Sequence, residues 1–131
     1  MPCVRRKTIA SPTFFMKNYI DSLKQPGATS GTKRVSLAEI PHGKTLKVGY
    51  FGGYREVSGE PQSASASKYI NLGYSLRGHD FFLASEDTAV TRMVITVNGI
   101  VYLPEGSIPF AVFEATTSSE DSVVIISGQL I

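Results

Sequence analysis

The segment Thr88–Leu103, TAVTRMVITVNGIVYL, is the stretch from which the fold can be inferred most directly. Its β-branched and aromatic residues fit a pleated, half-buried strand on each side of Asn98-Gly99. Asn-Gly is the pair that best accommodates the two positive φ angles of a type I′ turn. The segment therefore predicts a β-hairpin with a two-residue turn. The turn also fixes the register, and the predicted cross-strand pairs are Val97 with Ile100 and Ile95 with Tyr102.

Further strands are predicted on both sides of this hairpin, because apolar and polar residues alternate there. Lys68–Leu76 is the clearest case, with Ile70, Leu72 and Tyr74 on one face. Similar patterns occur at residues 34–40, 44–51 and 108–115, and short apolar runs predict strands at 80–84 and 123–131. Together with the hairpin they give about eight strands and no tandem repeat. We therefore expect a mainly β protein, an antiparallel β-sandwich or jelly-roll-like barrel with one N-terminal amphipathic helix.

Three segments precede the predicted β body. Residues 1–10, MPCVRRKTIA, show no periodicity and are interpreted as a basic arm. Ser11-Pro12 is typical of a helix start, so we predict an amphipathic helix at about 12–25. Its apolar stripe would consist of Met16, Tyr19, Ile20 and Leu23. Residues 27–33, GATSGTK, predict a flexible joint, and residues 11–131 are expected to form a single β-rich domain.

The composition describes a globular protein. The 131 residues are 42% apolar and 18% charged, and a chain of this length buries a core without disulfides. The single cysteine, Cys3, has no partner for an intramolecular disulfide. No apolar run approaches the roughly 20 residues that span a bilayer, and no apolar block follows the N-terminal cations. We expect an intracellular protein of the cytoplasm or nucleus, or a virion component, with no membrane span and no cofactor.

The basic residues are concentrated in the first part of the chain. Residues 1–47 contain nine Lys and Arg against two Asp and Glu, whereas residues 48–131 contain four against nine. This split favours an anionic partner for the first part, because adjacent cations bind phosphates without sequence preference. The candidate phosphate-binding residues are Arg5, Arg6, Lys7, Lys33, Arg34, Lys44 and Lys47. The alternative is that the two halves neutralise each other, within one fold or between subunits.

Residues 49–55, GYFGGYR, combine three aromatic residues with glycines and a cation. Aromatic side chains beside cations can stack on single-stranded bases. In that interpretation Tyr50, Phe51 and Tyr54 form the stacking surface, and Arg55 lies beside them. The structural alternative is a glycine bulge or sharp bend at which aromatic rings pack over exposed backbone.

Few residues are suited to catalysis. His42 and His79 both lie in predicted turns, and neither has a second ligand at metal-binding spacing. The adjacent His79-Asp80 pair is interpreted as a turn in which the aspartate bonds to its own backbone. The sequence therefore indicates no enzyme and no metal site.

The expected protein is a non-enzymatic, self-associating β-sandwich whose basic N-terminal region binds nucleic acid. The order of basic arm, flexible joint and β body resembles that of small viral coat and matrix-like proteins. The expected partners are further copies of the chain and single-stranded RNA or DNA. Two alternatives stay open: a protein- or ligand-binding module that uses the loops Glu60–Lys68 and Arg77–Asp80, and an enzyme whose site is assembled from strand ends.

Overall fold

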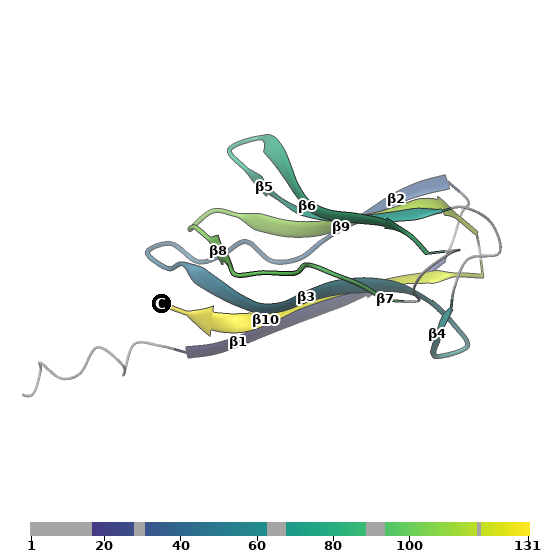
Figure 1. The fold of residues 1–131 in the computed structure, drawn as a ribbon, viewed down its shortest axis with the longest axis horizontal. Coiled ribbons are helices and arrows are strands. Elements are labelled where there is room, and N and C mark those ends of the chain that lie inside the picture. The colour runs from purple at the N-terminus through teal and green to yellow at the C-terminus, as the bar shows by residue number, and fades with distance from the viewer. Residues whose placement is uncertain (1–16, 28–30, 63–67, 89–93, 118) are drawn as a thin grey trace, which may run out of the picture.

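The computed structural model describes residues 17–27, 31–62, 68–88, 94–117 and 119–131 (Figure 1). This part of the chain forms two antiparallel β-sheets packed as a sandwich, and it contains no helix. Its ten strands are β1 (Lys17–Gln25), β2 (Gly31–Ser36), β3 (Leu46–Val57), β4 (Glu60–Gln62), β5 (Tyr69–Leu76), β6 (His79–Asp87), β7 (Val94–Thr96), β8 (Val101–Leu103), β9 (Ile108–Thr116) and β10 (Asp121–Leu130). The prediction of a mainly β, antiparallel sandwich is confirmed.

Each sheet is four strands wide. In the first, which we call the β3 sheet, β1, β10 and β3 are neighbours, and β8, β7 and β4 lie one after another along the remaining edge of β3. The second, which we call the β9 sheet, has the order β2-β9-β5-β6. The chain passes from one sheet to the other between β1 and β2, β2 and β3, β4 and β5, β6 and β7, β8 and β9, and β9 and β10. Neither sheet can therefore form as a separate unit.

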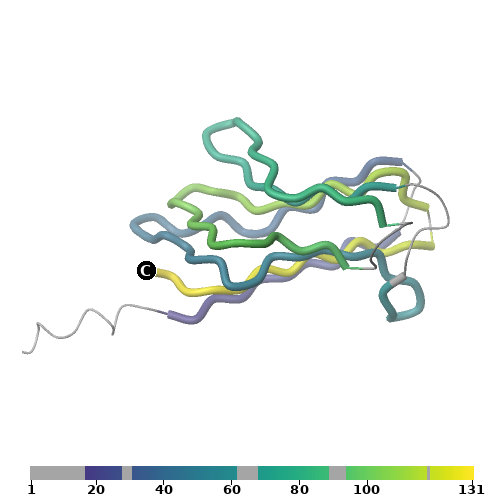
Figure 2. Tube along the Cα trace, viewed as in Figure 1, coloured from purple at the N-terminus to yellow at the C-terminus, as the bar shows by residue number. Residues whose placement is uncertain are grey.

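The predicted hairpin at residues 88–103 is wrong. β7 and β8 do not pair with each other, because both pair with β3, where Gly53 lies opposite Ile95 and Lys47 opposite Tyr102 (Figure 2). Gly99 has a positive φ of 95°, but Asn98 does not, so this pair forms no type I′ turn. One interrupted edge strand gives β3 main-chain partners along most of its length, whereas a separate hairpin would leave part of that edge unpaired.

Tight two-residue turns lie elsewhere, at Ser58-Gly59 and Arg77-Gly78. Their φ angles are 53° and 84° in the first pair and 52° and 81° in the second. Both residues of each pair thus have the positive φ of a type I′ turn. These turns join β3 to β4 and β5 to β6.

The predicted helix at 12–25 is also wrong wherever the structure describes it; residues 12–16 lie outside the described residues. β1 pairs with β10 over its whole length, from Lys17 opposite Leu130 to Gln25 opposite Ser122. Tyr19 packs against the core, but Ile20 is 75% exposed. Continuous pairing to β10 outweighs a short apolar stripe, because a helix of this length is marginal without burial of that stripe.

The boundaries at the start of the chain also differ from those predicted. Residues 1–10, the predicted arm, and residues 28–30 of the predicted joint at 27–33 lie outside the described residues. The last residues of that joint, 31–33, belong to β2, where Gly31 pairs with Thr116 of β9. The other predicted strands, at 34–40, 44–51, 68–76, 80–84, 108–115 and 123–131, all overlap observed strands.

The core lies between the two sheets. Phe51 and Ile126 of the β3 sheet and Ile70, Leu72 and Phe113 of the β9 sheet are fully buried there. Each side chain of this kind stabilises the fold by about 1.5–3 kcal/mol relative to exposure. Strand alternation then directs the residues between these core positions to the outer faces of the sandwich.

Candidate functional site

The four predicted phosphate-binding residues that the structure describes, Lys33, Arg34, Lys44 and Lys47, do not form one surface. The other three, Arg5, Arg6 and Lys7 of the predicted arm, lie outside the described residues. Lys33 Nζ donates to the main-chain oxygen of Pro26 at 2.9 Å. Lys44 is half-buried in the turn before β3, and Lys47 is exposed on β3, beside the fully buried Leu46 and therefore on the outer face of the β3 sheet.

Arg34 is held by its neighbours on the outer face of the β9 sheet. Its Nη1 and Nη2 atoms donate to the two carboxylate oxygens of Asp80 at 2.8 Å and 3.0 Å. Its guanidinium carbon lies 3.8 Å from the centre of the Phe110 ring. The hydrogen bonds hold the pKa of Asp80 below its ordinary value and raise the pKa of Arg34. A guanidinium engaged on a carboxylate and on a ring has few donors left for a phosphate.

Lys24 is paired in a similar way. Its Nζ atom lies 2.8 Å from Glu56 Oε1 and 3.9 Å from Asp121 Oδ2. The hydrogen bond to Glu56, followed by the charge of that carboxylate, raises the pKa of Lys24. Lys24 and Arg34 belong to the basic part of the chain, and their partners belong to the acidic part. For these two cations the halves neutralise each other within one fold, which is the alternative that the charge pattern left open.

The predicted stacking surface is divided between the two faces of β3. Phe51 and Arg55 are fully buried between the sheets and have no exposed surface with which to meet a base. Tyr50 and Tyr54 alternate with them and point to the outer face of the β3 sheet. Strand alternation, which the sequence displays, is the reason for this division.

Tyr50 packs over glycine backbone. A Cβ atom added to Gly52 would lie 2.5 Å from Tyr50 Oη, so the ring extends across that residue. Burial, and to a lesser degree Tyr54, raises the pKa of Tyr50. Beside it, the register between β10 and β3 shifts after Ser127, so Gly49 is the extra residue of a β-bulge. Both features match the structural alternative for residues 49–55.

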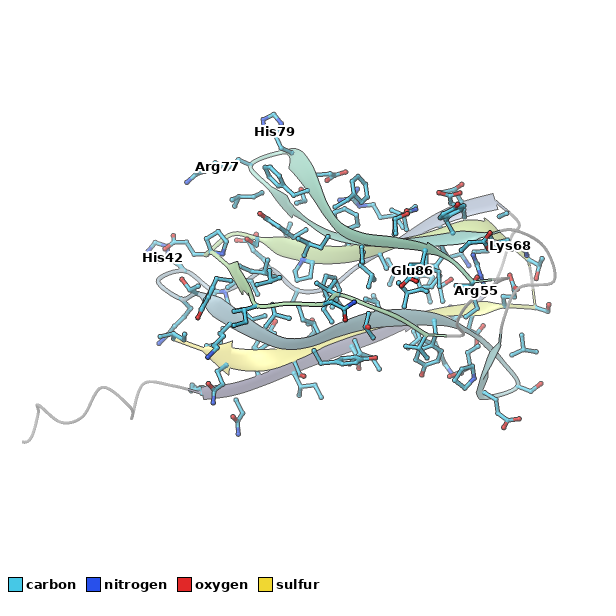
Figure 3. All side chains as sticks on the ribbon, viewed as in Figure 1. His42, Arg55, Lys68, Arg77, His79 and Glu86 are labelled. Atoms are coloured by element: carbon cyan, nitrogen blue, oxygen red, sulfur yellow. The ribbon has the colours of Figure 1, made fainter. Side chains whose placement is uncertain are left out.

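Arg55 belongs to a buried polar cluster at one end of the sandwich, near Lys68 (Figure 3). Its Nη2 atom donates to the main-chain oxygens of Glu114 at 2.9 Å and Tyr69 at 3.3 Å. Its Nη1 atom lies 4.0 Å from Glu120 Oε1, and Lys68 Nζ lies 3.5 Å from the same oxygen. Burial lowers the pKa of Arg55, and the charges of Glu120 and Glu114 oppose that shift. The cluster links β3 to β5 and β9, so Arg55 connects the two sheets.

The outer face of the β3 sheet carries several apolar side chains among polar ones. We call this surface the outer apolar face, and it consists of Ile20, Tyr50, Tyr54, Tyr102, Val123 and Ile125. Ile20 is 75% exposed, Tyr102 53% and Tyr50 40%. The sequence analysis did not identify this surface. The run Val123–Ile126 could have indicated it, because four consecutive apolar residues in a strand make both of its faces apolar.

The other candidate sites are scattered. Lys68 precedes β5 and Arg77 follows it, so the two loops of the predicted binding module lie at opposite ends of one strand (Figure 3). Residues 63–67 of the first loop are outside the described residues. In the described part of the chain, no group of three His, Cys, Asp or Glu side chains could hold a metal ion. The same residues contain no helix with the length and hydropathy needed to cross a membrane.

The fold is similar to that of a capsid chain. No protein-family model and no curated protein sequence matches this chain. Among solved structures, a chain of the acidic stable capsid of Helicobacter pylori bacteriophage KHP30 superposes with a TM-score of 0.59. The match covers 87% of each chain at 16% sequence identity. At this identity the likeness concerns the fold, and the described sandwich is therefore a fold that also occurs in a bacteriophage capsid.

Proposed function

We propose that this chain is a non-enzymatic structural protein of a viral capsid, and that it associates with further copies of itself. The observation that carries the proposal is the match over 87% of both chains to the capsid chain of bacteriophage KHP30. A localisation in the virion follows from the same proposal.

The strand order supports this proposal. With β7 and β8 counted as one interrupted strand and β4 set aside, the sheets have the orders β1-β10-β3-β7/β8 and β2-β9-β5-β6. Eight antiparallel strands in two four-stranded sheets, with connections that pass repeatedly between the sheets, form the arrangement of a jelly roll. Jelly rolls are frequent among viral capsid domains, although lectins and cupins use them too. The topology is therefore compatible with a capsid role, and the structural match favours that role over the others.

Nucleic-acid binding is a smaller part of the proposal than the sequence alone indicated. Its remaining candidates are the predicted arm residues Arg5, Arg6 and Lys7, together with Lys33, Lys44 and the exposed Lys47. Arg34 is engaged with Asp80, and Arg55 is fully buried. Any binding would therefore use phosphate contacts from the N-terminal region, without a stacking platform on β3.

Sedimentation velocity of the purified full chain tests the proposal. We expect species heavier than the 14.2 kDa chain, with a proportion that rises with concentration. A mass of 14.2 kDa at every concentration would contradict self-association. Added single-stranded RNA tests the arm separately: binding should weaken steeply with salt, and the triple substitution Arg5→Gln, Arg6→Gln, Lys7→Gln should flatten that dependence. No RNA binding at low salt would remove the nucleic-acid part and leave the structural role intact.

A further inference from the structure

The residues of the outer apolar face lie among polar ones, and those of β1, β10 and β3 meet diagonally between rows. Ser127 of β10 pairs with Ile20 of β1 on one side and with Tyr50 of β3 on the other. In the next row, Ile125 pairs with Ser22 and Gly52, and the Tyr50 ring lies across Gly52. The apolar side chains of neighbouring rows are thus in adjacent positions.

The outer face of the β9 sheet is different in character. Its large aromatic residue, Phe110, is fully buried because Arg34 lies over its ring and Phe82 packs against it edge-on. Asn71 donates to Glu114 at 3.0 Å on the same face. The chain therefore covers Phe110 at the centre of this face, although Phe82 itself is 59% exposed on β6; on the β3 sheet, Ile20 is 75% exposed and Tyr102 53%.

We propose that a second copy of this chain packs on the outer apolar face, so that two β3 sheets meet face to face about a twofold axis. This inference rests on the proposed self-association and adds the surface that performs it. An isologous contact requires a surface that complements itself. The outer apolar face meets that requirement if its apolar side chains pack on the same side chains of a second copy.

The charges at the two ends of the face indicate the relative orientation of the copies. Lys47 is exposed at one end, where it lies between Gln129 and Tyr102. At the other end, Glu56 and Asp121 share the single cation Lys24, at 2.8 Å and 3.9 Å, so these three side chains together carry one negative charge. A twofold axis that lies in the plane of contact, perpendicular to the strands, places Lys47 of each copy near the Asp121 end of the other, whereas an axis parallel to the strands would bring the two Lys47 ends together. The charges at the rim are then complementary in both halves of the contact.

The size of the face is sufficient for a specific contact. Four strands about 4.8 Å apart and rows that cover about eight residues at about 3.3 Å each give roughly 500 Å² per copy. Two copies would bury roughly 1,000 Å² in total, which is at the lower limit for a biological interface. We therefore expect an association of moderate strength that depends on the apolar centre.

Sedimentation velocity of surface variants tests this inference. Ile20→Lys and Tyr102→Lys replace the most exposed side chains of the face, where loss of packing costs the fold little. Each should raise the concentration for half-association at least about tenfold. Phe82→Lys is the matched control, because Phe82 is 59% exposed on the other sheet. It should leave association unchanged, and circular dichroism should show native strand content in all three variants.

The outcomes separate this inference from the proposed function. If the wild-type chain associates but Ile20→Lys and Tyr102→Lys associate equally well, the face is not the contact and the inference fails alone. Dissociation by Phe82→Lys alone would place the contact on the β9 sheet, with the same consequence. A wild-type monomer at all concentrations would overturn both statements. Lys47→Glu, an exposed substitution that removes no core packing, should also weaken association, and an unchanged affinity would exclude the orientation that places Lys47 near the Asp121 end of the other copy.

Discussion

The Nη2 atom of Arg55 donates a hydrogen bond of 2.9 Å to the main-chain oxygen of Glu114, and this bond crosses the sandwich from β3 to β9. A second bond from the same atom reaches the main-chain oxygen of Tyr69. Arg55 is fully buried, and within the described residues its Nε and Nη1 atoms have no hydrogen-bond partner. A charged side chain in this position connects the two sheets, but two of its nitrogen atoms are buried without hydrogen bonds to the described residues. Its removal should therefore change the stability of the fold.

Arg55→Ala should lower the free energy of unfolding by about 3–5 kcal/mol, because it creates a cavity, leaves the main-chain oxygens of Tyr69 and Glu114 without their donor and leaves Glu120 with Lys68 as its one remaining cation among the described contacts. Arg55→Met keeps most of the volume without the charge, so it should cost clearly less. Urea denaturation followed by circular dichroism measures both variants. If both variants lose the same free energy of unfolding, then the contacts of the guanidinium, rather than the volume that the side chain fills, account for its contribution to stability.

Gly128→Ala should destabilise the protein by about 1–3 kcal/mol or more. A Cβ atom at this position would collide with the main-chain oxygen of Lys47 at the β10–β3 bulge. Gly49→Ala is the matched control, since its Cβ would meet only ordinary contacts of 3.6 Å and 3.7 Å at the same bulge. Thermal unfolding of the two variants compares them directly. A Gly128→Ala variant as stable as Gly49→Ala would refute the close approach of β10 to β3.

Asp80→Asn should make the free energy of unfolding depend less on pH in the acidic range. The hydrogen bonds from Arg34 hold the pKa of Asp80 below its ordinary value of 3.8. A lowered folded pKa means that the pair stabilises the fold above the ordinary value, and that this contribution is lost as pH falls through the folded pKa. The urea midpoints of wild type and Asp80→Asn should therefore differ at neutral pH and converge in strong acid. A difference that stays constant down to about pH 2 would contradict the ion pair.

Arg77→Asn should stabilise the protein by up to about 1 kcal/mol, because asparagine tolerates a positive φ better than other side chains do. Arg77 is the first residue of the β5–β6 turn, with a φ of 52°. Its side chain is exposed, so little packing is lost. A thermal midpoint below that of wild type would show that the arginine side chain has a stabilising contact at the turn.

Local patterns in the sequence predicted most strands but failed where pairing across the fold decides the outcome. The alternation of Lys68–Leu76 predicts β5 because one face of that strand is buried by neighbours that any sandwich supplies. Asn98-Gly99 predicts a hairpin from turn geometry alone. In the structure β3 provides a longer edge, and Ile95 and Leu103 reach the core by pairing with it.

The predicted helix failed for a related reason. Tyr19, Ile20 and Leu23 have helical spacing, but no surface in the described fold covers such a stripe, and β10 offers nine main-chain pairs instead. The candidate nucleic-acid residues depended on distances that a sequence does not contain. Arg34 lies in β2, whereas its partner Asp80 lies in β6, and β9 and β5 separate these two strands in the sheet.

An experimental structure of the associated protein is the most direct test of the account. We expect two sandwiches with the β1-β10-β3 and β2-β9-β5-β6 strand orders, joined through Ile20, Tyr50 and Tyr102 of both copies. A contact between copies that leaves these three side chains in solvent would contradict the account. So would a protein that remains a single 14.2 kDa sandwich.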